Sequence, residues 1–152
     1  MRQFDFTIKI FLGHHCNGAC EYAEGKGSVR LEDNQVDQLV ALIKEHGGET
    51  NVEALGLEEK YPEIYKALDC ASYDAACEAN YRHWLIEGYL CGYFEPESGR
   101  RPRKIKNFRS LSEDEQVAYI EENYGDVMDQ GEPGDFEYAP VIPEGIVELA
   151  KK

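Results

Sequence analysis

The sequence predicts an α+β fold, in which a small antiparallel sheet near the N-terminus packs with four to five helices. Three observations lead to this prediction. Apolar and polar residues alternate over residues 4–12, apolar residues recur with helical spacing over residues 36–43, and residues 63–90 hold no proline and a single glycine. Alternation is typical of a strand with one buried face, and the i, i+3, i+4, i+7 spacing is typical of an amphipathic helix.

The sheet is expected to be a hairpin of residues 4–12 and residues 28–32. Every second residue of the first strand is apolar: Phe4, Phe6, Ile8, Ile10 and Leu12. Because successive side chains of a strand point to opposite faces, this strand would bury one face. Residues 13–27 are rich in glycine, histidine and cysteine, and they are expected to form a long connection between the two strands.

A first helix is expected directly after the hairpin, with Asp33 or Asn34 as its N-cap. Its apolar stripe consists of Val36, Leu39, Val40 and Ile43. Gly47 and Gly48 would end this helix, since glycine readily adopts the left-handed conformation found just past helix C-termini. A short helix within residues 51–59 is expected next.

A long central helix is expected at about residues 62–90. Pro62 suits its first turn, where a backbone N–H has no partner within the helix. The alternative is two helices that join near residues 69–72.

The last part of the chain carries two further helix signals. Ser112 and Glu115 form a capping-box pattern at the start of one helix. Pro143 opens a last short helix, and residues 136–138 are compatible with a short strand.

Size and composition indicate a single globular domain over residues 1–152. Apolar residues make up 42% of the chain and aromatic residues 11%, which is more than a disordered chain contains. No stretch approaches the roughly 20 apolar residues that span a bilayer, so we expect no membrane association. Five cysteines without a recognisable secretion signal indicate reduced thiols and a cytoplasmic protein.

Charge is unevenly distributed along the chain. The net charge is −14, but residues 100–109 contain no acidic residue. This basic strip consists of Arg100, Arg101, Arg103, Lys104, Lys106 and Arg109. It could contact phosphates or an acidic partner, or lie as a solvated loop on the chain's own acids. Because acidic residues on both sides repel nucleic acid, we expect no nucleic-acid partner.

A candidate metal site lies in the expected connection between the strands. Its potential ligands are His14, His15, Cys16 and Cys20, and zinc binds imidazole and thiolate in tetrahedral sites. However, adjacent side chains rarely point at one ion, and the sequence has no second cluster of this kind. The alternatives are an exposed loop with incidental histidine and cysteine, and a Cys16 nucleophile activated by an imidazole.

The long helix carries apolar residues on two opposite sides. Its aliphatic and alanine side is expected to pack inside the domain. The other side holds Tyr73, Tyr81 and Trp84, and tyrosine and tryptophan are frequent in interface hot spots. This aromatic side either packs within its own domain or contacts a partner, and a second copy of the chain is one candidate.

The motifs that mark common nucleotide-binding and hydrolytic sites do not occur: the sequence has no GxGxxG, Walker A, GxSxG or HExxH pattern. We therefore expect an intracellular protein that binds another protein, without catalysis and without a cofactor. Two alternatives remain open. One is a zinc-binding protein centred on residues 14–20, and the other is an acidic mimic of nucleic acid that inhibits a nucleic-acid-binding protein.

Overall fold

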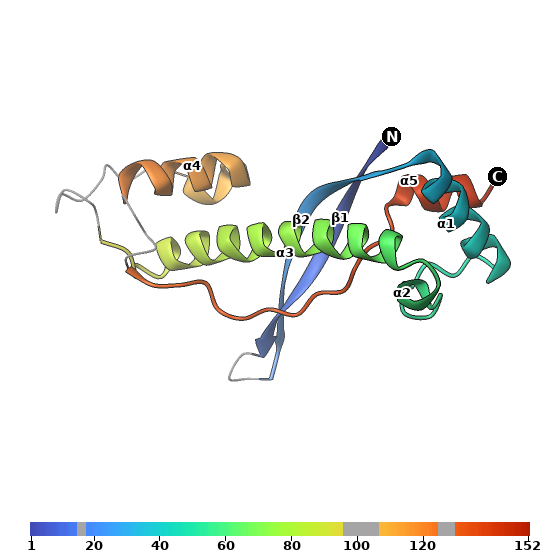
Figure 1. Ribbon diagram of the computed structural model, residues 1–152. Helices are drawn as coiled ribbons and strands as arrows, with labels where there is room; N and C mark the ends of the chain where they lie inside the picture. The colour runs from blue at the N-terminus through green and yellow to red at the C-terminus, as the bar shows by residue number, and fades with distance from the viewer. Residues whose placement is uncertain (15–17, 96–106, 125–129) are drawn as a thin grey trace. The chain divides into compact units, whose positions relative to one another are not determined.

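The computed structural model confirms the α+β fold (Figure 1). It describes residues 1–14, 18–95, 107–124 and 130–152. Two antiparallel strands, β1 (Arg2–His14) and β2 (Cys20–Leu31), come first. They are followed by α1 (Asp33–Glu45), α2 (Leu57–Lys60), α3 (Pro62–Leu90), the 3-10 helix η1 (Phe108–Ser110), α4 (Glu113–Asn123) and α5 (Glu144–Ala150).

The hairpin is longer than the sequence predicts. Because β2 begins at Cys20, most of the expected connection over residues 13–27 is strand, and that prediction was wrong. The two strands pair from Arg2 opposite Leu31 to His14 opposite Cys20. The alternation of β2 is not visible in the sequence, because Gly25 and Gly27 occupy its inward-packing face, where an alternating strand carries apolar side chains.

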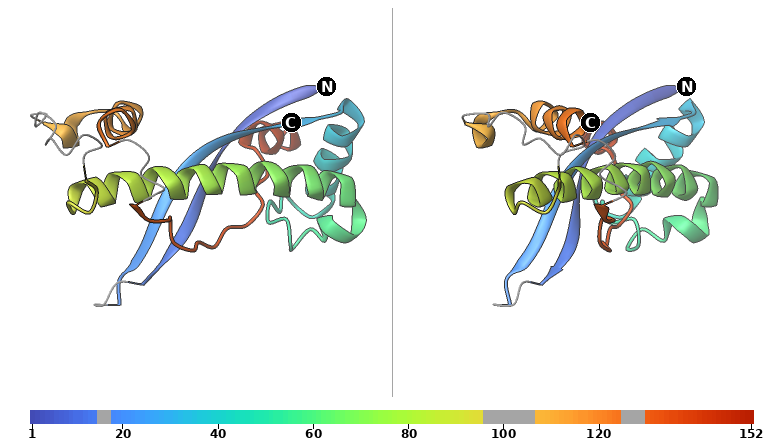
Figure 2. Two further views of the ribbon diagram at one scale, coloured as in Figure 1. Left: turned by 60° about the vertical axis from the view of Figure 1, so that its left-hand side comes forward. Right: turned by 90° about the vertical axis from the view of Figure 1, so that its left-hand side faces the viewer.

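Gly25 and Gly27 allow the hairpin to lie directly against α3. A Cβ atom at Gly25 would stand 2.7 Å from the Cβ of Ala79, and one at Gly27 would stand 2.9 Å from the Cβ of Ala75. Two carbon atoms cannot approach this closely without displacement, so glycine is required at both positions. Figure 2 shows the strands crossing α3. Glycine inside a strand often marks such a close approach, and here it explains the loop-like composition.

The first helix, α1, begins one position earlier than expected. Its N-cap is Glu32 rather than Asp33 or Asn34. The side-chain oxygen of Gln35 accepts a hydrogen bond from the Glu32 N–H at 2.9 Å, and the two residues form a capping box. Three members of the predicted apolar stripe are buried, namely Val36, Leu39 and Ile43, whereas Val40 is only half-buried and Leu42, which was not predicted, is buried. Gly47 and Gly48 follow the helix in left-handed conformation, at φ 67° and 91°.

The long helix α3 is continuous, which excludes the alternative of two helices joined near residues 69–72. Pro62 stands at its first position, as predicted. The aliphatic and alanine side is buried at Ile64, Leu68, Ala75 and Ala79. Among the described residues, no helix combines the length and the apolar character needed to cross a membrane.

The chain divides into two compact units. Unit 1 comprises residues 1–79 and 136–152, and unit 2 comprises residues 80–135. The core of unit 1 is mainly aliphatic, and α5 packs against α1 and β1. The single domain expected from chain length stays a prediction.

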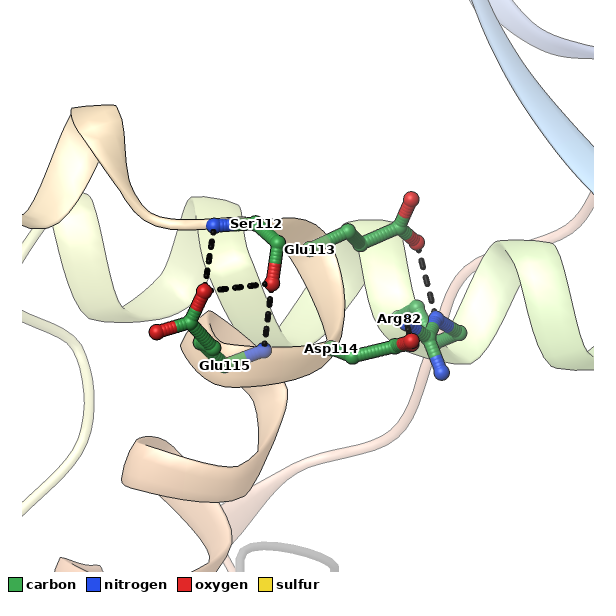
Figure 3. A network of polar contacts seen from close by, with 5 residues as sticks. All are labelled: Arg82, Ser112, Glu113, Asp114 and Glu115. Atoms are coloured by element: carbon green, nitrogen blue, oxygen red, sulfur yellow. Dashed lines mark hydrogen bonds and ion pairs between the residues drawn. The ribbon is translucent and has the colours of Figure 1, made fainter.

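Unit 2 has a smaller core. Its buried apolar side chains in the described ranges are Leu85, Phe94, Phe108, Val117 and Ile120. The predicted capping box of α4 is confirmed, since the Ser112 hydroxyl accepts a hydrogen bond from the Glu115 N–H at 3.2 Å (Figure 3). Beside this cap, the Arg82 side chain pairs with Glu113 at 2.8 Å and with Asp114. The negative charges of the same two residues also interact favourably with the positive, N-terminal end of the α4 dipole.

Candidate functional site: an acidic groove in unit 1

Unit 1 contains a groove of about 820 Å³. One wall is formed by residues 50–59, which include the turn before α2 and most of α2 itself. The other wall is formed by residues 138–147, which are the extended chain entering α5 and the start of that helix. Tyr65 of α3 also lines the groove. A volume of this size accommodates a few side chains of a partner.

A turn capped by its own side chain shapes the first wall. The side-chain oxygen of Asn51 accepts a hydrogen bond from the Ala54 N–H at 2.9 Å. Gly56 adopts the left-handed conformation with φ 64°, which directs the chain into α2. Val52 and Leu57 are buried, so the wall is anchored in the core of unit 1.

Hydrogen bonds to α3 and to β1 hold the second wall. The Tyr138 hydroxyl donates to Asp69 at 2.9 Å, and the Val141 N–H donates to the hydroxyl of Ser72 at 3.0 Å. Glu137 exchanges two backbone hydrogen bonds with Phe11 of β1, at 2.8 and 2.9 Å. This pairing is a single isolated β-bridge at Glu137, so the short strand expected at residues 136–138 is reduced to one bridging residue. The wall is therefore positioned by the fold before any ligand arrives.

The groove combines apolar surface with negative charge. Val141 and Val147 are half-buried and line it, whereas Glu53, Glu58 and Glu144 line it as exposed residues. No lysine, arginine or histidine is found among the described residues that line the groove. The ion pairs between described residues do not include Glu53 or Glu58. Both carboxylates are therefore exposed, and no base among the described residues neutralises them in an ion pair.

Two tyrosines report the electrostatic character of the groove. Burial raises the pKa of Tyr65, and the charges of Glu58, Asp69 and Glu53 raise it further. Burial raises the pKa of Tyr138 to about 12, together with its hydrogen bond to Asp69 and the charge of that residue. In both cases the neighbouring carboxylates oppose a further negative charge on the phenol. The same field favours a positively charged group.

The predicted metal ligands fall partly outside the described residues, which exclude His15 and Cys16. His14 ends β1 opposite Cys20, which begins β2 and is exposed. In the described ranges, no group of three or more histidine, cysteine, aspartate or glutamate side chains could hold a metal ion. The zinc hypothesis is not tested by these residues and stays a prediction.

The predicted aromatic side of α3 is divided between the two units. In unit 1, Tyr73 is 48% exposed, and its ring lies 5.6 Å from that of Tyr138. In unit 2, the half-buried Trp84 ring packs edge-on against Phe94 at 5.0 Å and lies 6.3 Å from Tyr81. Each aromatic residue thus has neighbours within its own unit. A homodimer seam on this side stays a prediction.

Most of the basic strip lies outside the described residues, which exclude Arg100, Arg101, Arg103, Lys104 and Lys106. Arg109 is described and is exposed within η1. The predictions for a phosphate or acidic partner of this strip therefore remain predictions.

The two walls of the groove come from segments about 80 residues apart, so no local sequence pattern indicates the groove. The sequence shows the acidic side chains at positions 53–59 and the tyrosines Tyr65 and Tyr138. No sequence pattern indicates that they lie close together in the fold. No significant match is found to any protein-family model, curated protein or solved structure.

Proposed function

We propose that this protein acts by binding a basic, amphipathic segment of another protein in the groove of unit 1. The observation that carries the proposal is the pairing of apolar lining residues with carboxylates on both walls and no basic lining residue. Apolar side chains of the segment would supply affinity through burial. Its basic side chains would supply charge complementarity and faster association.

The position of the acids favours a polypeptide over a small cation. Glu53 and Glu58 belong to the first wall and Glu144 to the second, with Val141 and Val147 also in the lining. A ligand that satisfies this arrangement needs apolar groups together with more than one positive charge. An amphipathic peptide carries both, because side chains three and four residues apart share one face of a helix.

A synthetic peptide of leucine and lysine, about twelve residues long with leucine at helical i, i+3, i+4 spacing, serves as the probe. We expect fluorescence anisotropy to detect binding that weakens as salt rises, because exposed charges are screened. A second peptide with glutamate in place of every lysine should not bind.

Two matched charge-reversal variants locate the binding surface. Glu53→Lys with Glu58→Lys should abolish binding, since it places positive charge on one groove wall. Glu121→Lys with Glu122→Lys makes the same change in net charge on exposed residues of α4 in unit 2, and it should leave affinity within about twofold. Equal loss of binding in both variants would contradict the groove as the site.

A further inference from the structure

Two tyrosine side chains line the groove in addition to its aliphatic residues and its carboxylates. Tyr65 and Tyr138 both line it and are both half-buried. The negative charge that Tyr65 would carry on deprotonation contributes to the raised pKa of Tyr138, so the two phenols lie within electrostatic range of each other. The hydrogen bond from the Tyr138 hydroxyl to Asp69 fixes one of these side chains.

We infer that Tyr65 and Tyr138, with the carboxylates of Glu53 and Glu58, form a subsite for one lysine or arginine side chain of the bound segment. This inference rests on the proposed peptide-binding function, and it specifies which part of the groove binds one positively charged side chain of the peptide. The faces of aromatic rings attract cations. The carboxylates complete the site by accepting hydrogen bonds from an ammonium or guanidinium group.

The hydrogen-bonding state of Tyr138 supports a cation over an anion. Its hydroxyl hydrogen is already donated to Asp69, so its oxygen retains only acceptor capacity toward a ligand. The environment of Tyr65 is negative as well, because the charges of Glu58, Asp69 and Glu53 act on it and raise its pKa. A phosphate or carboxylate ligand would meet repulsion at this position, whereas the donors of lysine and arginine meet acceptors.

The test uses peptides that keep the leucine pattern and are neutral except at one position. That position carries lysine, arginine or the uncharged lysine analogue norleucine. We expect the lysine and arginine peptides to bind wild-type protein about tenfold more tightly than the norleucine peptide, a difference in the range of a desolvated cation–π contact. Isothermal titration calorimetry provides the dissociation constants.

The variants separate the subsite from the groove as a whole. Tyr65→Leu should remove the preference for lysine over norleucine, Tyr65→Phe should retain most of it, and Glu58→Gln should reduce it. Tyr22→Leu is the matched control, because Tyr22 is an exposed tyrosine of β2 in unit 1 whose ring packs against Phe11 and does not line the groove. It should keep the full preference, and circular dichroism should give the same helix content for all four variants.

The outcomes distinguish failure of this inference from failure of the proposed function. If the norleucine peptide binds as well as the lysine peptide, or if Tyr65→Leu keeps the full preference, the subsite is refuted while peptide binding by the groove stands. If Tyr65→Leu unfolds the chain, Glu58→Gln decides, and an undiminished preference in that variant also refutes the subsite. If neither these peptides nor the multiply charged probe binds wild-type protein, the proposed function fails and the inference fails with it.

Discussion

The two units differ in how their cores are built. In unit 1, aliphatic side chains such as Ile10, Leu31 and Leu39 are fully buried at 0% exposure. In unit 2, the buried cluster includes Phe94 and Phe108 and is surrounded by half-buried tyrosines. The ring of Tyr89 lies 4.3 Å from Phe108 and 5.7 Å from both Tyr119 and Tyr124.

This difference shows two ways in which one chain obtains stability. Unit 1 spreads its buried area over many aliphatic residues from the hairpin and from α1, α3 and α5. Unit 2 has only five buried apolar side chains in the described ranges, and two of them are phenylalanine rings, which bury more area than an aliphatic side chain. Loss of one side chain should therefore remove a larger share of the stability of unit 2.

The largest expected effect tests this difference directly. Phe108→Ala should destabilise unit 2 by about 3–5 kcal/mol, because it removes a buried ring and leaves a cavity. Hydrogen exchange should then report lost protection in α4 while the amides of β1 and α1 keep theirs. Equal loss of protection in both units would show that they unfold together, as in the single domain that chain length predicts.

The next effect concerns the close approach of the hairpin to α3 in unit 1. Gly25→Ala should cost about 1–3 kcal/mol, since overpacking forces neighbouring backbone to move. The added Cβ would stand 3.0 Å from the carbonyl oxygen of Ala75, which is backbone and cannot rotate away. Gly134→Ala is the control, because a Cβ there meets nothing within 4 Å. Thermal melting should separate the two variants, and equal melting temperatures would contradict the packing constraint.

A smaller effect is expected at the start of α4 in unit 2. Ser112→Ala should cost about 1 kcal/mol, because the Glu115 N–H loses its side-chain acceptor. Ser112→Asn restores an acceptor and should recover most of the loss. Urea denaturation measures both changes, and a fully stable Ser112→Ala variant would show that the cap contributes nothing.

The smallest effect is expected at alkaline pH and compares one tyrosine in each unit. Burial raises the pKa of Tyr119 from 10.0 to about 12, with Tyr89 contributing, and the pKa of Tyr138 is also about 12. Because the folded state holds these protons more tightly than the unfolded state, stability is complete below pH 10 and declines as pH rises toward 12.

Tyrosine-to-phenylalanine variants assign this alkaline loss to a unit. Tyr138→Phe should reduce it for unit 1, and Tyr119→Phe should reduce it for unit 2, as measured by urea denaturation on both sides of pH 10. Stability that rises with pH in this range would contradict the direction of both shifts.

Much of the fold could be predicted because it depends on local patterns. The stripe of α1, the proline at the start of α3 and the Ser112–Glu115 capping box are all readable from residues a few positions apart. The hairpin length could not be predicted, since Gly25 and Gly27 face Ala79 and Ala75 from a different element. The candidate site could not be predicted either, because Tyr65 and Tyr138 are far apart in the chain.

The sequence by itself determined the α+β class, the order of the elements and the aliphatic and alanine side of α3. These features follow from side-chain periodicity and from capping residues, which act within a few positions of the chain. Only the tertiary structure decided that residues 20–27 form a strand, and that residues 50–59 and 138–147 form the two walls of one acidic groove. Both results depend on contacts between segments that are distant in the chain. At such contacts, the surface of one element limits the size of the side chains that the other can have.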